Sequence, residues 1–304
     1  MHVRKGALVL ALVAVGLCAP SPASAAPVAI TLCALPGAAT MAGGASVPIW
    51  GFATGCANPG LPGPVLSVTV GDTVAITVTN ALPAGHPLTF EAPGIAFDPG
   101  PDSAPPGGTV TRTFTASAPG TYLYQSGGDA GRQAAMGLYG ALIVRPATAP
   151  DYDVEAPLVL SAIDPAFNAA PETFDLHAYR ATYWLVNGKS YPDTAPGITA
   201  AGGQRLLLRY LNAGYDNTTM TMLGLHGRVV ARDARPIAGT LDVTAETVPA
   251  GATEDLLVTV PAGAGPSPHG FPLYNRQQHL TNGPQTGTGP APAAGGGMLI
   301  FIHH

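Results

Sequence analysis

The chain has 304 residues, of which 39 are glycine and 32 are proline, so long uninterrupted helices are not expected. Charged residues make up only 10% of the sequence and the formal net charge is −5, which excludes a nucleic-acid-binding protein and a highly charged disordered chain. The apolar share of 46% is enough for a packed core, and the length predicts two domains.

The amino-terminal segment, residues 1–25, has the pattern of a secretory signal peptide. Two basic residues precede an apolar run from Gly6 to Cys18, and a small-x-small site ends at Ala25. A membrane anchor would need about 20 apolar residues, whereas this run has 13 and is followed by prolines. We therefore expect cleavage after Ala25 and a secreted or extracytoplasmic protein, with no later segment apolar enough to cross a bilayer.

Three cysteines are present, and removal of the leader would leave two of them, Cys33 and Cys56. In an oxidising compartment these two are most simply joined as a disulfide that closes a loop of 24 residues. A pair of free thiols is the alternative. The same cleavage would leave 11 basic against 18 acidic residues, and a net charge of −7 gives no electrostatic reason to bind DNA or anionic lipid.

Strand patterns dominate from Val65 onward. Between Leu66 and Asn80, apolar residues alternate with Thr or Ser around a turn at Gly71-Asp72, which predicts two half-buried strands. Short segments of the same type, separated by Gly, Pro and Asn, continue to the end of the chain and predict β-sandwich or barrel domains. These further segments are Thr109 to Ala116, Gly120 to Gln125, Gly140 to Val144, Leu158 to Ala162, Tyr183 to Val186, Leu206 to Leu211, Arg228 to Arg232, Leu256 to Val260 and Met298 to Ile302.

An internal repeat divides these strands into two sets. The segment from Gly71 to Asn80 aligns with that from Gly203 to Asn212, since both begin with Gly and reach Asn nine residues later. A later pair, beginning at Gly140 and Gly297, aligns in the same way. The offset grows from 132 to 157 residues, as loop insertions in a duplicated domain would produce.

The repeat predicts the domain organisation. The stretch from Arg145 to Pro150 is typical of a linker. We expect a signal peptide over residues 1–25, a first domain over 26–148 and a second domain over 149–304. A stretch rich in Gly, Pro and Ala from Gly283 to Gly297 is expected to be a mobile loop before the last strand.

Several short motifs occur in the order in which one protein family has them. They are Pro62-Gly63-Pro64, Gly71-Asp72, Pro119-Gly120-Thr121-Tyr122-Leu123-Tyr124, Val186-Asn187-Gly188-Lys189 and Arg209-Tyr210-Leu211-Asn212-Ala213-Gly214. With these motifs the chain resembles the multicopper oxidases over most of residues 30 to 304. The resemblance implies an all-β fold made of two cupredoxin-like Greek-key β-sandwich or barrel domains.

The resemblance also implies copper sites built from His-x-His pairs and from a Cys flanked by His, and this chain departs from those motifs. Where the family has Tyr-His-Ser-His, the sequence has Tyr124-Gln125-Ser126-Gly127. The first His-x-His-Gly corresponds to the stretch from His86 to Gly94, which holds no His pair. A later one corresponds to Gly224-Leu225-His226-Gly227, which keeps one histidine. The Cys-containing motif is replaced by the stretch from Tyr274 to His279, and Met298 stands where the family has its axial Met.

A count of ligands leads to the same expectation. A blue copper site needs a thiolate with two histidines, but both cysteines of the exported chain lie before residue 60. A trinuclear site in this family uses eight histidines, whereas residues 26–304 contain seven and no His-x-His. We therefore expect the type 1 and trinuclear copper ligands to be lost. The seven histidines are His86, His177, His226, His269, His279, His303 and His304.

Three functions stay open from the sequence. The first is a non-catalytic binding or structural module, which we favour over an enzyme. The second is a copper-dependent oxidoreductase of multicopper oxidase type with a reduced, atypical site at His226, His279 and Met298. The third is a copper-sequestering protein that holds one ion at such a site, because imidazole and thioether ligands suit Cu(I).

The competing interpretation of these candidate copper ligands is structural. Met220 and Met222 could form a mononuclear copper site with His226, but they alternate with threonines and are expected in a core instead. Eighteen residues separate His279 from Met298, so their proximity does not follow from the sequence. The ligand count does not support copper as a cofactor, the sequence identifies no ligand or partner, and a homo-oligomer is left open.

Overall fold

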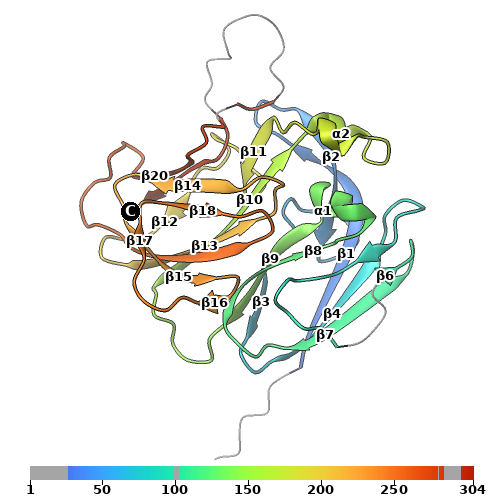
Figure 1. Cartoon of the computed structure of the whole chain (residues 1–304), viewed down its shortest axis with the longest axis horizontal. Helices are drawn as coiled ribbons and strands as arrows, with labels where there is room; N and C mark the ends of the chain where they lie inside the picture. The colour runs from blue at the N-terminus through green and yellow to red at the C-terminus, as the bar shows by residue number, and fades with distance from the viewer. Residues whose placement is uncertain (1–26, 99–102, 280, 284–295) are drawn as a thin grey trace, which may run out of the picture.

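The computed structural model describes residues 27–98, 103–279, 281–283 and 296–304 (Figure 1). The predicted signal peptide lies outside these residues, and so does most of the predicted loop from Gly283 to Gly297. The described chain consists mainly of strands, with helical segments of only three to five residues, so the predicted all-β fold is confirmed. Among the described residues, no helix has the length and apolar character that crossing a bilayer requires.

The amino-terminal half contains two main sheets. The first sheet consists, in spatial order, of β2 (Ser46–Ala53), β1 (Pro27–Thr40), β4 (Thr73–Asn80) and β7 (Thr109–Thr115). The second consists of β3 (Leu66–Thr69), β9 (Tyr139–Arg145) and β8 (Gly120–Gln125). A short ladder joins β5 (Leu88–Thr89) to β6 (Ser103–Ala104), and η1 (Asp129–Gly131) and α1 (Arg132–Ala135) follow β8. Alternating side chains of strands such as β4 enter one apolar core shared by both sheets.

The carboxy-terminal half is a larger version of the same arrangement. Its first sheet has the order β11 (Tyr183–Val186), β10 (Val154–Ile163), β13 (Arg205–Asn212), β19 (Thr253–Thr259), β15 (Gly227–Arg232) and β16 (Arg235–Pro236), and β17 (Asp242–Val243) pairs with β15. Its second sheet has the order β12 (Ile198–Thr199), β21 (Leu299–His303), β20 (Phe271–Asn275), β14 (Thr218–Met222) and β18 (Ala245–Val248). The helical segments α2 (Pro165–Ala169) and η2 (Leu176–Ala178) lie between β10 and β11 in the chain.

The two halves share one pattern of strand pairing. β1 pairs parallel with β4 as β10 does with β13, and β3 pairs parallel with β9 as β12 does with β21. The antiparallel pairs β4–β7 and β8–β9 likewise correspond to β13–β19 and β20–β21. The aligned segments of the internal repeat are therefore equivalent strands, β4 and β13. Pairings between the described strands stay within residues 27–145 or 154–303, and the boundary between 148 and 149 stays a prediction.

Two buried asparagines, Asn80 and Asn212, end these equivalent strands and make equivalent hydrogen bonds. Asn80 Nδ2 donates to two carbonyl oxygens at 2.9 Å, and its Oδ1 accepts from the amide two residues later at 3.0 Å. Asn212 Nδ2 donates to two carbonyl oxygens at 2.8 and 2.9 Å, and its Oδ1 accepts from the amide two residues later at 3.0 Å. Each side chain thus ties the end of a strand to the loops beside it, which explains why both aligned segments end in Asn.

An apolar cluster joins the two halves. Strands β8 and β9 of the first half contact β10 and β13 of the second (Figure 1). Leu206, Leu208 and Tyr210 of β13 face the core of the second half, and the contact with the first half helps to cover the other face. Every residue of β13 after Arg205 is therefore buried. The cluster consists of Leu123, Tyr139, Ala141, Ile143, Val159 and Leu211.

A buried polar network crosses the same interface. Thr121 Oγ1 of the first half donates to Asp255 Oδ1 at 2.6 Å and accepts from Arg209 Nη1 at 2.8 Å. Arg209 also lies 3.1 Å from Asp255 and from Glu155. Thr121, Arg209 and Asp255 are 1%, 3% and 5% exposed. Burial raises the pKa of the Asp255 carboxyl, although the Arg209 charge and the Thr121 hydrogen bond act to lower it.

The structure adds strands that the sequence does not predict. No strand is expected before Leu66, yet β1 and β2 form the edge of the first sheet. Pro36 and Gly37 interrupt the alternation of β1, and its parallel pairing with β4 is non-local, so the local pattern carries no sign of it. The predicted disulfide between Cys33 and Cys56 is present and joins β1 to the loop after β2, with the Cα atoms 5.2 Å apart.

Candidate functional site

The two motifs that depart from the family's His pairs in the first half lie next to each other. Glu91 and Gln125 form an isolated antiparallel bridge, with backbone hydrogen bonds of 2.9 and 2.8 Å. Gln125 Nε2 also donates to Glu91 Oε1 at 2.9 Å. At Gly127 an added Cβ would lie 2.9 Å from Glu91 Oε1, so a larger residue there would meet the same carboxylate. The polar groups at these positions are therefore bonded to one another.

A buried hydrogen-bonded chain continues from this pair of motifs. The hydroxyls of Thr89 and Ser126 lie 3.1 Å apart, and Ser126 Oγ donates to Gln133 Oε1 at 2.7 Å. Gln133 Nε2 in turn donates to Asp129 Oδ2 at 2.9 Å. Ser126 and Gln133 are fully buried. A buried polar group without a partner would lower the free energy of unfolding, and these hydrogen bonds avoid that cost.

This series of hydrogen bonds ends at His86, a histidine held between two carboxylates. His86 Nδ1 lies 2.7 Å from Asp129 Oδ2, and His86 Nε2 lies 3.2 Å from Glu172 Oε1. A neutral imidazole carries one N–H, so both contacts are hydrogen bonds only when the ring is protonated. The ring also packs on Trp50, with centroids 4.6 Å apart, beside a cavity of about 450 Å³. This arrangement links the first half to the segment after α2 in the second half.

Two of the three predicted copper ligands line one small cavity. His279 follows β20 and stacks on Trp184 of β11, with ring centroids 4.3 Å apart. Met298 directly precedes β21, and its Sδ lies 3.9 Å from Asn275 Nδ2. Both residues border a cavity of about 10 Å³, which is close to the size of a single water molecule. The structure therefore brings His279 and Met298 to the same place.

The ring of His279 has an unusual environment. Its Nδ1 atom is buried and makes no hydrogen bond to any described residue, and the same holds for Nε1 of Trp184, which lines the same cavity. Burial lowers the pKa of His279, and the negative charge of Asp216 acts in the opposite direction. A neutral imidazole with a free ring nitrogen is the form that binds a metal ion.

The third predicted ligand, His226, lies elsewhere. It is exposed, directly precedes β15, and borders a different cavity together with Arg228 and Asp242. Met220 and Met222 of β14 are buried in the core of the second half, as expected. Within the described part of the chain there is no group of three or more His, Cys, Asp and Glu side chains placed to hold a metal ion.

Sequence reasoning missed the cluster at His86. In the sequence the stretch from His86 to Gly94 stands out only for lacking a His pair, and nothing there connects it with Asp129 or Glu172. They lie 43 and 86 residues from His86 in the chain, so no local spacing indicates that they meet. The Asp129 backbone has a positive φ of 54°, which is uncommon for a residue with a side chain, but this too is invisible in the sequence.

Comparisons with known proteins point to one family. Residues 38–149 match the family model described as multicopper oxidase. The chain is 27% identical over 246 residues to the multicopper oxidase MmcO of Mycobacterium tuberculosis, an alignment that covers 68% of this chain and 48% of that protein. It is 36% identical over 115 residues to copper resistance protein A of Pseudomonas syringae, covering 34% and 18%. The chain thus spans at most about half the length of these relatives.

Solved structures show the same fold. The blue copper oxidase from Nitrosomonas europaea superposes with a TM-score of 0.78 at 21% identity, covering 91% of this chain and 86% of that one. The copper nitrite reductase from Nitrosomonas europaea gives a TM-score of 0.70 at 21% identity, covering 91% and 94%. At this level of identity the similarity establishes the arrangement of the two sandwiches.

Proposed function

We propose that the chain is an exported, non-catalytic member of the multicopper oxidase family, which its family-model match and its relatives support. In this proposal it keeps the two-domain cupredoxin architecture and acts as a binding or structural module. Its type 1 and trinuclear copper ligands are lost in this proposal. The family binds copper, so the decisive question is whether the side chains at the equivalent positions of this chain suit that metal.

The contact between Gln125 and Glu91 is the observation that carries the proposal. These residues belong to the two stretches that stand where the family has His pairs, and their side chains are hydrogen bonded at 2.9 Å. Amide and carboxylate groups are harder ligands than imidazole, and here each is engaged with the other. The neighbouring Thr89 and Ser126 hydroxyls are likewise bonded to each other. The donor set does not fit a trinuclear copper cluster.

A type 1 copper centre does not fit either. Such a centre needs a thiolate, and Cys33 and Cys56 are joined to each other. At the stretch that replaces the family's Cys-containing motif, the described donors are the His279 imidazole and the Met298 thioether. No oxidase step is therefore derived for this chain.

A copper titration tests the proposal. The purified chain is loaded anaerobically with Cu(I) or Cu(II), dialysed, exposed to air and analysed for metal content, visible absorption and oxidation of a simple phenol. We expect no intense blue band and no phenol oxidation. An intense blue band, or several copper ions per chain together with turnover, would refute the proposal.

Copper sequestration is the second candidate function. It is favoured by the unpartnered Nδ1 of His279 and the thioether of Met298, which border one cavity. A single Cu(I) ion held there would account for copper binding without oxidase chemistry. His279→Ala and Met298→Leu should then each abolish the binding of one ion, whereas His226→Ala should leave it unchanged because His226 borders another cavity. Equal binding by all three variants would reject this site.

A further inference from the structure

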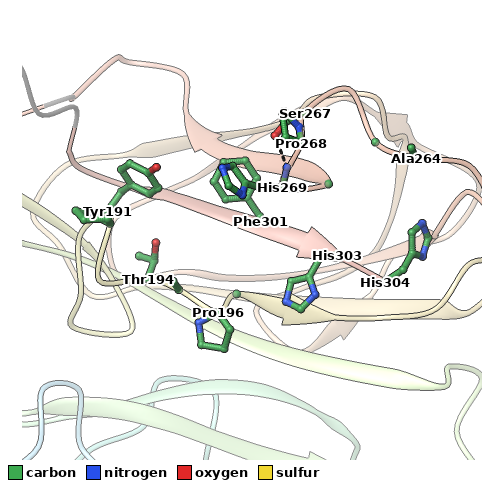
Figure 2. Close-up of a pocket in the computed structure, with 15 residues that line it drawn as sticks. Tyr191, Thr194, Pro196, Ala264, Ser267, Pro268, His269, Phe301, His303 and His304 are labelled. Carbon is green, nitrogen blue, oxygen red and sulfur yellow. Dashed lines mark hydrogen bonds between the residues drawn. The ribbon is translucent and has the colours of Figure 1, made fainter.

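A cavity of about 630 Å³ lies at the edge of the carboxy-terminal half, and none of His86, His226, His279 and Met298 borders it (Figure 2). Three segments form it: the loop over residues 191–197, the turn over residues 264–270, and the end of β21 with the carboxy-terminal residues. Its volume falls in the range of pockets that enclose small molecules, which is roughly 300–1,000 Å³. The cavity is therefore a candidate binding site separate from the candidate copper ligands.

The walls of the cavity are fixed by backbone contacts. Thr194 Oγ1 donates to Leu299 O at 2.6 Å and holds the loop against β21. A Cβ at Gly197 would lie 2.4 Å from Phe301 O, and one at Gly270, whose φ is +96°, would lie 2.2 Å from Ile302 O. Both glycines thus let the loop and the turn approach β21 more closely than another residue could. A ligand would meet a largely preformed surface, and less ordering on binding favours affinity.

The side chains in the described lining of this cavity carry no fixed charge. Among the described residues that border it there is no Asp, Glu, Lys or Arg. An ionised ligand would lose part of its hydration there without gaining an opposite charge. The lining therefore favours an uncharged ligand.

The polar groups of the lining both donate and accept hydrogen bonds. Three histidines border the cavity, His269, His303 and His304, with the hydroxyls of Thr194 and Ser267. A neutral imidazole offers one donor and one acceptor, and a hydroxyl offers both. His304 Nε2 lies 3.1 Å from Gly263 O and donates to that carbonyl. A purely apolar ligand would leave such groups without partners, so the ligand must itself donate and accept repeatedly.

Aromatic rings supply the apolar part of the surface. The ring of Phe301 lies close to those of His269 and Tyr191, at centroid distances of 5.4 and 6.3 Å. In Figure 2, Tyr191 and Phe301 lie along one side of the cavity, and His303 and His304 lie further along it. His269 is held over Phe301 by the hydrogen bond from its backbone N–H to Ser267 Oγ at 3.0 Å. Such rings pack against flat apolar faces.

We propose that this cavity binds an uncharged carbohydrate of about disaccharide size. A sugar ring combines an apolar C–H face, which packs on the aromatic rings of the lining, with hydroxyls that donate to and accept from the imidazoles. A proline-rich peptide also binds aromatic grooves, but its carbonyls only accept, so it would leave the acceptor nitrogens of the histidines unpaired. The carbohydrate therefore satisfies more of the lining.

Saturation-transfer NMR on the purified full chain tests this proposal. The probes are maltose, cellobiose and a proline-rich decapeptide, each titrated to tens of millimolar. We expect at least one disaccharide to bind. Tyr191→Ala and His269→Ala should weaken its binding by about tenfold each, the loss expected for one ring contact. Tyr191→Phe keeps the ring and should stay within about twofold.

The control variant is His177→Ala, which removes an exposed histidine of η2 that does not border the cavity. Circular dichroism verifies that each variant is folded. Failure of both disaccharides to bind, equal binding by Tyr191→Ala and the unaltered chain, or binding of the peptide alone would overturn the proposal. The copper titration tests the proposed function in a separate experiment, so disaccharide binding can be absent while the proposed function holds, and the reverse.

Discussion

Replacing Thr121 with Val tests whether the buried polar network holds the two halves together. Val has nearly the shape of Thr, so no cavity is created, but the hydroxyl is lost. That hydroxyl donates to Asp255 at 2.6 Å and accepts from Arg209 at 2.8 Å. A hydrogen bond to a charged group contributes about 1.5–3 kcal/mol. Arg209 and Asp255 keep their own 3.1 Å contact, so the combined loss should be near the lower limit for two bonds, about 3 kcal/mol.

Urea unfolding followed by circular dichroism measures this loss, and Thr121→Ser is the matched control. Ser keeps the hydroxyl and removes one methyl group, which should cost about 1 kcal/mol. The cost of Thr121→Val should also increase with pH. Without the Thr121 hydrogen bond the pKa of Asp255 rises further, and the penalty is greatest where that carboxyl is ionised. If the Val and Ser variants unfold at the same urea concentration at neutral pH, the network does not stabilise the interface.

Four further substitutions test other parts of the fold. Burial raises the pKa of Glu254 to about 7, so the unfolding free energy should fall as the pH rises from the unfolded carboxyl's value of 4.5 to about 7. This decrease in unfolding free energy is at most about 3 kcal/mol, and Glu254→Gln should abolish it. Urea unfolding below pH 4.5 and above pH 7 measures the difference. Cys33→Ala should lower stability by about 2–4 kcal/mol, and a reductant should then lower the melting temperature of the unaltered chain but not of the variant. Asn80→Ala and Asn212→Ala should each cost about 2–4 kcal/mol in the same unfolding assay, and a loss at only one of them would contradict their equivalence.

Local patterns were enough to predict the strands with a clear period. β4 and β13 carry apolar runs or alternation that end in Asn, and their alignment indicates the repeated topology. β1 could not be predicted in this way, because Pro36 and Gly37 interrupt it and its residues 27–34 each pair with one 46 positions further along the chain, as Pro27 does with Thr73. The burial of the second face of β13 depends in part on contact with the other half, which no local pattern records.

The candidate site was predictable only in part. Residue types identified His279 and Met298 as the soft donors of the second half, and the fold places both beside one cavity. His226 was grouped with them because it follows a family motif, but it precedes β15 and borders another cavity. The cavity of Figure 2 combines three distant segments whose histidines and aromatic residues carry no local signature. The sequence therefore indicates which residue types could act as ligands, but not which of them the fold brings together.

Because both faces of β13 are buried, the two halves of this protein are not expected to be stable when expressed as separate fragments. A fragment that ended before β10 would leave Leu123 and Ile143 uncovered, and the complementary fragment would leave Val159 and Leu211 uncovered. Either fragment would thus present a fresh apolar surface and tend to aggregate when expressed alone. Thr121 and Arg209 would also be separated, leaving a charge without its buried partners. The two sandwiches should consequently melt as one cooperative unit.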